Sequence, residues 1–517
     1  MQTIVASHNL TTGLFIFAFL AISLLTVRII HALYFSSLAH VPGPAINKVT
    51  ELPLRYLNAR LERNERIFEW HRKYGPVVAI APGQVSFSSV HIAKEIYSAA
   101  AKHPKSSYFD SLAMFGYRSV FMAKEPSDHR RLRKRIFAYY QPTKVYKPAV
   151  LGYIREYARR ACVEMGKAIP AKQAGDFATV NIFVHCNNFS FDNITRFCLG
   201  PSLCSDTIRG GEEARSIYVG WEECELWAPL GSSFPMVLSL VKLFKKQLQG
   251  NELFLTGDSR LQAWCTQQLS IAAKDPTKAG QESESLLRQM LEYKSEDGSR
   301  LPLDEIAEEI LDNFFAAQSV VTNALIFLLW DLARFPAWQQ KIRKQLESFP
   351  TEQDGLPSWA DIETASILDA CLQESSRVHP LASGRAERVV PVTKSYGQTV
   401  IPKGTIVSAS TKSLHYNATA FPQPEVFDPA RWLDASETQL AAMKSSFMPY
   451  GQGARTCIGV PFAMAQMKHL VAFFILSHEI LEDKASATNK ASMMQLGTQS
   501  ALPRGLRCDL KVRKISN

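Results

Sequence analysis

The sequence contains no Cys-x-x-Cys pair, although it has 9 cysteines among its 517 residues. Zinc ribbons and dithiol redox centres need such pairs, so neither kind of site is indicated. The odd number and wide spacing of the cysteines favour a reducing compartment. Gly and Pro, with 26 and 27 residues, form no repeats, which excludes a collagen-like, mucin-like or mainly disordered chain.

Charged residues are few, at 21% of the sequence, whereas hydrophobic residues make up 46%. This balance allows a large hydrophobic core. The net charge of +10 indicates an acidic partner or an anionic surface. A basic run, DHRRLRKR, occupies residues 128–135. It has no interleaved aromatic residues and belongs to no known nucleic-acid fold, so we expect no nucleic-acid partner.

Residues 9–27 lack charged side chains altogether, and residues 14–25 are apolar on every helical face. The 18 residues 10–27 span about 27 Å as a helix, close to the thickness of a bilayer core. A cleaved signal peptide is less favoured because no basic segment precedes the apolar run. We therefore predict an N-terminal segment at 1–9 on the luminal side and a transmembrane anchor with its juxtamembrane segment at 10–35.

Basic residues are absent from positions 1–13 but follow the apolar run, from Arg28 onward. The positive-inside rule then places the large C-terminal part in the cytosol. Residues 36–45 include Val-Pro-Gly-Pro and predict a stiff hinge, because proline interrupts a helix. Residues 46–517 contain no obvious linker and predict one catalytic domain.

The predicted fold class of this domain is mainly α with minor β structure. Short β-rich runs at 77–80 and 85–87 flank a Pro-Gly turn. Helical periodicity covers 106–121, 146–168, 180–199 and 215–248, and the polar stretch 274–302 predicts a surface connection. The strongest helix prediction is 304–334, which begins with acidic residues, ends at Arg334 before Pro336, and would be about 45 Å long.

A single cysteine, Cys457, lies in the glycine-rich segment FMPYGQGARTCIG at 447–459, directly before an apolar helical stretch. Backbone N–H groups and a helix N-terminus can stabilise a thiolate at such a place. A structural turn with a buried cysteine is the alternative for this segment alone. A phosphate-binding loop is excluded, because no Lys-Ser or Lys-Thr follows the glycines.

Two further segments give this cysteine a context: LQESSRVHP at 372–380 and FDPARW at 427–432. Together with the cysteine segment, in this order and at these intervals, they resemble the cytochrome P450 family of haem-thiolate enzymes. The resemblance covers about residues 40–513 and the anchor. It implies a single large domain with a long central helix.

The resemblance assigns roles around a haem b group. Cys457 would supply the axial thiolate, which favours O–O cleavage by donating electron density. Four further residues would contact the haem propionates: His129, Arg133, Arg388 and Arg455. A buried charge triad would brace the cysteine loop: Glu374, Arg377 and Arg431. Tyr450 stands where the family usually has Phe.

The central helix departs from the family's acid–alcohol pair above the haem. The ungapped alignment puts Ser319 at the acid position and Val320 at the threonine position. A shift by one residue pairs Gln318 with Ser319 and still provides no acid. Neither arrangement supplies a carboxylate relay. We keep Gln318, Ser319, Val320 and Thr322 as catalytic candidates, with simple helix packing as the alternative.

An apolar substrate is expected from the remaining positions that the resemblance points to. These are Phe109, Met114, Phe115, Tyr117, Leu226, Trp227, Phe314, Ala317, Val321, 381–383 and 494–496. The resemblance implies an endoplasmic-reticulum monooxygenase that uses O2 and NADPH-derived electrons from a reductase, which the basic run at 128–135 would attract. We expect a fungal secondary metabolite as substrate. Radical coupling or desaturation, a haem-thiolate isomerase and a non-catalytic haem protein stay open as alternatives.

Overall fold

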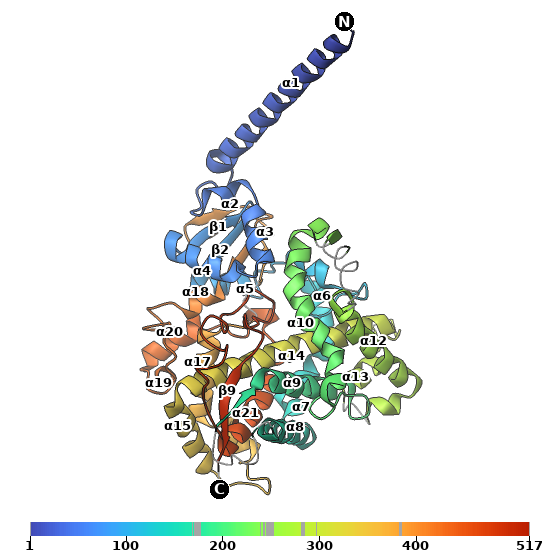
Figure 1. Ribbon diagram of the computed structural model, residues 1–517, viewed down its shortest axis with the longest axis vertical. Coiled ribbons are helices and arrows are strands. Elements are labelled where there is room, and N and C mark those ends of the chain that lie inside the picture. The colour runs from blue at the N-terminus through green and yellow to red at the C-terminus, as the bar shows by residue number, and fades with distance from the viewer. Residues whose placement is uncertain are drawn as a thin grey trace.

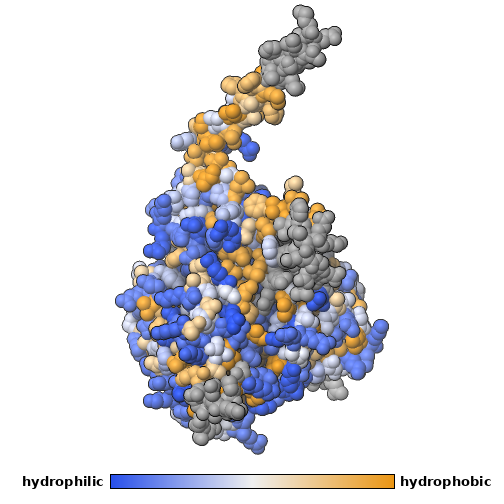
Figure 2. Space-filling view, in the orientation of Figure 1, coloured by the Kyte–Doolittle hydropathy of each residue, from blue (hydrophilic) through white to orange (hydrophobic). Residues whose placement is uncertain are grey.

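A long apolar helix, α1 (Gln2–Ile30), projects from one end of the molecule (Figure 1). The computed structural model describes residues 2–167, 169, 177–237, 239–240, 243, 253–280, 285–295, 297–381 and 385–515. An 18-residue window of Gly13–Phe35 has a mean hydropathy of 2.4 and is not buried, and the coloured part of the projecting helix is mostly hydrophobic (Figure 2), so this stretch can cross a membrane. Two other described helices, α14 and α21, are also long and apolar enough, with mean hydropathies of 1.5 and 1.4, but they are mostly buried inside the body.

The segment after α1 is packed against the body. Val41 is fully buried, and Ala79 N donates a hydrogen bond to Pro42 O at 2.7 Å. A Cβ atom on Gly43 would lie 2.5 Å from Ala79 O, so only glycine permits this approach. The predicted hinge is therefore attached to the domain at its C-terminal end.

Four strands form the largest sheet, in the order β1-β2-β7-β4. Their bounds are β1 (Val77–Ala81), β2 (Gln84–Phe87), β4 (Arg388–Val389) and β7 (Ile406–Ala409). β1 and β2 form the antiparallel hairpin that the sequence predicted, and β2 pairs with β7 in parallel. The smaller sheets are β3 (Ala178–Asn181), β9 (Asp509–Lys514) and β8 (His478–Glu482), and β5 (Lys394–Tyr396) with β6 (Thr399–Ile401).

Helices make up the rest of the regular structure, so the mainly α class with minor β is confirmed. Before the central helix the structure has α2 (Ala45–Val49), α3 (Leu52–Ala59), α4 (Arg63–Tyr74), η1 (His31–Phe35), α5 (Val90–Tyr97), η2 (Ser107–Leu112), α6 (Pro126–Ile136), η3 (Phe137–Tyr140), α7 (Pro142–Val145), α8 (Pro148–Lys167), α9 (Ile182–Leu199), α10 (Gly211–Ser233), α12 (Leu253–Lys274), η5 (Pro276–Ala279) and α13 (Leu286–Glu292). The remaining helices are α14 (Leu303–Arg334), α15 (Pro336–Glu347), α16 (Trp359–Glu363), α17 (Ser366–Val378), α18 (Thr411–His415), α19 (Ala430–Leu433), α20 (Glu437–Ser446), η6 (Gly453–Arg455) and α21 (Val460–Ser477).

The central helix is α14, as predicted, and it has 32 residues. Its C-terminal half, from Val321, belongs to one hydrophobic core cluster that includes α8, α9 and α21. Its N-terminal half, from Ile306 to Phe314, belongs to a second cluster that includes α9, α12 and α13. α14 thus crosses the body and joins both cores (Figure 1).

Three element predictions were wrong in part. The stretch 106–121 is not a continuous helix, because only Ser107–Leu112 is helical and Gly116 adopts φ +78°. The predicted connection 274–302 contains α13, which buries Leu286, Leu287 and Met290 against the core. The predicted helix 180–199 begins with strand β3. The end of the predicted helix 215–248 lies outside the described residues at 238, 241–242 and 244–248.

Candidate functional site

The cysteine segment forms a tight loop ahead of α21. Cys457 N donates to Tyr450 O at 3.0 Å, and Thr456 N donates to Gly453 O at 3.1 Å. Gly453 has φ +72°, and a Cβ there would lie 2.0 Å from Tyr97 O. This glycine is therefore required both by its backbone conformation and by the close approach of α5. The hydroxyl of Tyr450 donates to Met464 Sδ at 3.5 Å, which gives the unusual tyrosine a partner on α21.

The sulfur of Cys457 is accessible although its surroundings are desolvated. Cys457 keeps solvent-accessible surface, yet desolvation raises the pKa of its thiol. The N–H groups of Gly459 and Val460 and the charge of Arg133 partly offset this rise. Donors around the sulfur favour its thiolate form.

The three triad residues are brought together in the interior. Arg377 donates to both carboxylate oxygens of Glu374, at 2.8 and 2.9 Å, and both side chains are fully buried. Arg431 Nε donates to Glu374 Oε1 at 2.9 Å. Trp432 Nε1 and Asp428 N complete the shell around this carboxylate, at 2.9 and 3.0 Å. Such full pairing is the condition under which buried charges are tolerated.

A chain of hydrogen bonds connects this triad to the cysteine loop. Arg377 Nη1 donates to His415 O at 3.1 Å. The ring Nε2 of His415 accepts a hydrogen bond from Met448 N, at 2.9 Å. Burial lowers the pKa of His415 to about 3, so the imidazole is neutral and can accept. The geometry is thus suited to the bracing role that the resemblance implies.

A group of basic side chains lies beside the cysteine loop without carboxylate partners. Arg455 donates to Ala123 O and Lys124 O at 2.7 and 2.8 Å, and Arg133 donates to Thr456 O at 2.9 Å. Arg388 is buried and donates only to Glu387 O, at 2.9 Å. Lys105, which sequence analysis missed, is buried and donates to Phe121 O. None of the four cations forms an ion pair within the described part of the chain.

The pKa values of this group show that its members repel one another. Desolvation and, after it, the charge of Arg388 lower the pKa of Arg455 to about 9. Burial, followed by Arg455, Arg133, Lys105 and Arg388, lowers the pKa of His129 to about 3. Four cations and an imidazole are thus close enough to interact. We call Lys105, His129, Arg133, Arg388 and Arg455 the cation cluster.

The accessible sulfur of Cys457 and the cation cluster both fit a haem group. Unpaired buried cations are costly, and two propionates would neutralise them. On α14, Ala316 is exposed and Ala317 and Val320 are half-buried, although their neighbours Gln318 and Ser319 are buried. Small side chains therefore leave room on one face of the central helix. Ala317 and Ile458, the residue after Cys457, border the same core cluster.

The basic helix α6 has two kinds of side chains. Arg130, Arg131 and Lys134 are exposed. Arg135 is buried and donates to Glu305 on α14 at 2.5 Å. The expectation that Arg135 belongs to the basic surface was therefore wrong, because a carboxylate that is distant in sequence neutralises it inside the fold.

The catalytic candidates on α14 mostly contact α9. Gln318 Nε2 donates to Asn187 Oδ1 at 2.6 Å, and Ser319 Oγ donates to Gln318 Oε1 at 3.0 Å. The Thr322 hydroxyl pairs with that of Ser190 at 2.6 Å. Val320, with no polar group, is on the half-buried face. The three polar side chains therefore have protein partners, as the packing alternative expects, and their catalytic role stays a prediction.

Three carboxyl groups near the start of α14 were not recognised as site residues in the sequence. Glu308 accepts from Met114 N and Phe115 N at 2.9 and 2.7 Å, and Glu309 accepts from Val120 N at 2.9 Å. Burial raises the pKa of Glu309 to about 8 and that of Asp312 to about 7. These acids fasten the segment 114–120 to the central helix. The sequence signal that could have identified them is the occurrence of three acidic residues within two turns of an otherwise apolar helix.

The expected substrate contacts are divided between core and partly exposed positions. Phe109, Phe314 and Val321 are buried, and Phe314 packs in the second core cluster. Met114, Phe115, Leu226 and Ala317 are only partly buried. Ala382 and Ser383 lie outside the described residues. Substrate contact stays a prediction for all of these positions.

Comparisons with known proteins agree on one family. A family profile described as Cytochrome P450 matches residues 52–503. The chain is 35% identical to the cytochrome P450 monooxygenase FGM1 of Gibberella zeae over 490 residues, or 95% of each chain. It is 25% identical to the cytochrome P450 monooxygenase oblB of Aspergillus clavatus over 468 residues, or 86% of each chain. Rat cytochrome P450 4F5 is 32% identical over 219 residues, covering 42% of this chain and 41% of the relative.

Proposed function

The chain belongs to the cytochrome P450 family, and from this premise we propose that it inserts oxygen into an apolar small organic molecule, a fungal secondary metabolite, at haem iron ligated by Cys457. Family membership makes it an oxidoreductase of the monooxygenase class with a haem-thiolate cofactor. The proposal adds the ligand, the substrate class and the fate of the oxygen atom. The observation that carries it is the accessible sulfur of Cys457 beside an unpaired cation cluster.

The protein side chains have distinct tasks in this proposal. The thiolate of Cys457 would hold the iron, and the N–H groups of Gly459 and Val460 would limit its basicity. Arg133, Arg388 and Arg455 would bind the propionates, with His129 as a neutral donor. When bound, haem supplies the oxidising chemistry, and thiolate donation favours O–O cleavage. The half-buried side chains of Ala317 and Val320 would face the substrate space and exclude water.

The membrane and redox partners belong to the same proposal. Gly13–Phe35 is long and apolar enough to anchor the chain, and we propose the endoplasmic-reticulum membrane with the domain on the cytosolic side. Electrons would come from NADPH through a reductase. The exposed side chains of Arg130, Arg131 and Lys134 on α6 support docking of an acidic reductase, and Arg133 links this helix to the cysteine loop at Thr456 O.

Replacement of the proposed ligand tests the proposal. Cys457→Ala should remove the thiolate signature from the spectrum of the ferrous carbon-monoxide adduct, and turnover should fall to background. Cys204→Ser, at a half-buried cysteine outside the site, is the control and should retain both. A Cys457→Ala protein that keeps the thiolate spectrum would refute the assignment of the ligand.

A second candidate function is oxidation without oxygen insertion, by radical coupling or desaturation. The observation in its favour is that Gln318 and Ser319 are hydrogen-bonded to protein partners, while Val320 occupies the threonine position. Labelled dioxygen separates the functions. Label in the product supports insertion, and consumption of NADPH and dioxygen without label supports coupling or desaturation. Product formation without consumption of either supports an isomerase.

A further inference from the structure

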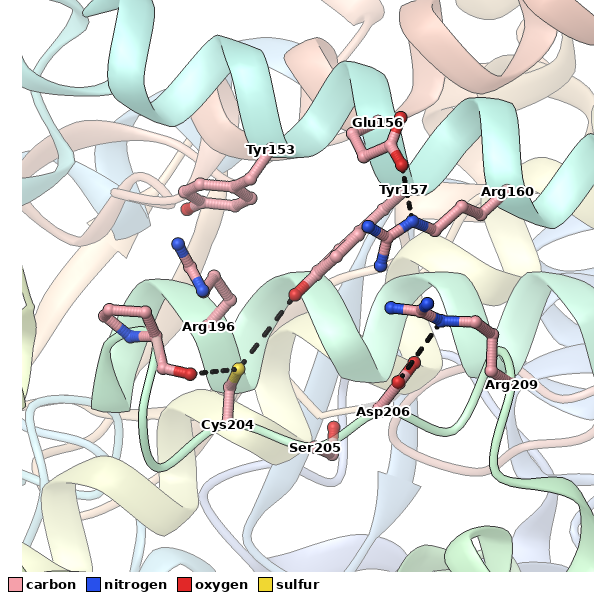
Figure 3. A pocket seen from close by; sticks show the side chains of 10 residues that line it. Tyr153, Glu156, Tyr157, Arg160, Arg196, Cys204, Ser205, Asp206 and Arg209 are labelled. Carbon is pink, nitrogen blue, oxygen red and sulfur yellow. Dashed lines mark hydrogen bonds and ion pairs between the residues drawn. The ribbon is translucent and has the colours of Figure 1, made fainter.

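A polar cavity of about 460 Å³ lies between α8, the end of α9 and the loop after α9. It shares no residue with the haem-thiolate site. Figure 3 shows side chains from both helices and from the loop converging on it, with Arg196 and the hydroxyl of Tyr157 near its centre. Its volume is within the range of small-ligand pockets.

One wall is a single face of α8. Tyr153, Glu156, Tyr157 and Arg160 line the cavity and follow each other at helical spacings of three, one and three residues. Residues at such spacings project from the same side of a helix. The wall is held by the buried ring of Tyr157 and by the ion pair from Arg160 Nε to Glu156 Oε1, at 2.6 Å.

The opposite wall of the cavity is the loop after α9, which is held by hydrogen bonds to a side chain of α9. The buried carboxylate of Asp192 accepts hydrogen bonds from Ser205 Oγ at 2.6 Å, Thr207 N at 2.8 Å and Ile208 N at 2.9 Å. With a further bond from the Thr207 hydroxyl at 2.9 Å, the loop makes four hydrogen bonds to one buried side chain and is preorganised. The cavity is thus a built feature, and ligand binding there would cost little ordering entropy.

The charges that line the cavity do not balance. Arg160 pairs with Glu156, which also pairs with Arg159, and Arg209 pairs with Asp206 at 3.3 Å. Arg196, the third lining arginine, has no ion pair among the residues described. Its guanidinium lies 5.5 Å from the centroid of the Tyr153 ring. An excess positive charge therefore faces the cavity.

A hydrogen-bond donor is also without a partner there. The hydroxyl of Tyr153 is buried and makes no hydrogen bond to any residue that the structure describes. The hydroxyl of Tyr157 has only the weak contact with Cys204 Sγ, at 3.9 Å. A buried hydroxyl without a partner is costly, so a ligand acceptor at this place is favoured. Two phenols beside a guanidinium that has no carboxylate partner among the described residues match a ligand group that is anionic and only accepts hydrogen bonds.

We propose that this cavity binds the phosphate group of a small soluble phosphate monoester, with Arg196 as its main cationic contact and the Tyr153 hydroxyl as a donor. A phosphate has enough oxygens for the guanidinium and both phenols, and its charge neutralises the excess. The source is soluble, because α8 and α9 lie toward the end of the body remote from α1 (Figure 1).

Binding is tested on the full-length protein with inorganic phosphate and glycerol 3-phosphate, and glycerol serves as the uncharged control. Calorimetric titration should give a Kd at or below about 1 mM for glycerol 3-phosphate and no binding of glycerol. Vesicles of phosphatidic acid test the lipid source. Absence of binding of both soluble phosphates, or binding to phosphatidic acid alone, overturns the proposal.

Three variants test the named contacts. Arg196→Gln should weaken binding about tenfold or more, because a charged contact is lost. Tyr153→Phe should weaken binding several-fold and leave the melting temperature without ligand unchanged or raised, since its hydroxyl has no bond to lose. Arg66→Gln removes an exposed arginine on α4 and matches the first variant in net charge. Equal binding by the Arg196→Gln and Arg66→Gln variants overturns the proposal.

Discussion

The two sides of the proposed haem site handle buried charge in different ways. On the cysteine side, the carboxylate of Glu374 accepts five hydrogen bonds from four residues, and its arginine partners also donate to backbone carbonyls. On the α14 side, Glu309 and Asp312 are buried and form no ion pair within the described residues, and burial raises their pKa values to about 8 and about 7. The carboxylate of the triad is thus fully paired, whereas burial favours the protonated form of the carboxyl groups on α14.

The two sides of the proposed site therefore have different tasks: the cysteine side gives structural support, and the α14 side makes contacts that can change. A fully paired network keeps one geometry, which suits the loop that holds the proposed metal ligand, Cys457. Carboxyl groups that titrate near neutral pH can change state, and those on α14 fasten the segment 114–120, where the resemblance expects substrate contacts. The cysteine side also retains the family motif, whereas the α14 side departs from it at Ser319 and Val320.

The largest effect is expected when the paired side loses its carboxylate. Glu374→Gln leaves Arg377 and Arg431 buried without a counter-charge, so the free energy of unfolding should fall by about 3–5 kcal/mol. Denaturant unfolding and haem content measure the loss. Glu437→Gln, at the exposed start of α20, is the control. If Glu374→Gln is as stable as this control, the triad does not brace the fold.

The next effect concerns the pH dependence of the other side. The folded-state pKa of Glu309, about 8, is above its unfolded value, so this group stabilises the fold at low pH and the contribution is lost as pH rises toward 8. Glu309→Gln should remove about 3 kcal/mol of the decline in unfolding free energy between pH 5 and pH 8. In the Glu309→Gln variant, Asp312 still causes a smaller decline in the unfolding free energy, because burial also raises its pKa. The double variant with Asp312→Asn should abolish that remaining decline. If the unfolding free energy depends on pH in the same way in wild type and in both variants, the burial of Glu309 as an acid is contradicted.

A moderate effect is expected in the cation cluster. Arg388→Met removes a buried, unpaired cation, so the haem-free protein should be as stable as wild type or more stable, while haem affinity should fall about tenfold. Transfer of haem to an excess of scavenger protein measures the affinity, and denaturant unfolding measures the stability. A loss of stability without faster haem transfer would mean that Arg388 has a structural role only.

The smallest effect tests the departure on α14. Ser319→Asp with Val320→Thr restores an acid and a hydroxyl, and product formed per NADPH should rise about two- to fivefold while peroxide falls. Val320→Thr alone is the control for the hydroxyl. If the ratio of product to peroxide does not change in the double variant, the departure has no mechanistic consequence.

Prediction from the sequence succeeded where the signal was local. The cysteine loop and Glu374 with Arg377 are short motifs, so their type and spacing were visible, and α14 has strong periodicity with clear ends. Prediction failed for Lys105 and for the inward turn of Arg135, because their surroundings come from segments far away in the chain. The predicted helix at 106–121 failed because the acids of α14 accept its backbone N–H groups and hold an irregular course.

The amino-acid order alone determined the anchor, the central helix, the single chemically distinctive cysteine and the absence of an acid–alcohol pair, since each depends on neighbours in the chain. The tertiary structure alone decided which charges are compensated. Arg135 forms an ion pair with Glu305, while Arg388 and Lys105 form none within the described residues, and Arg196 faces a cavity. The energy of a charge depends on burial and on partners brought close by folding, and neither is encoded in local spacing.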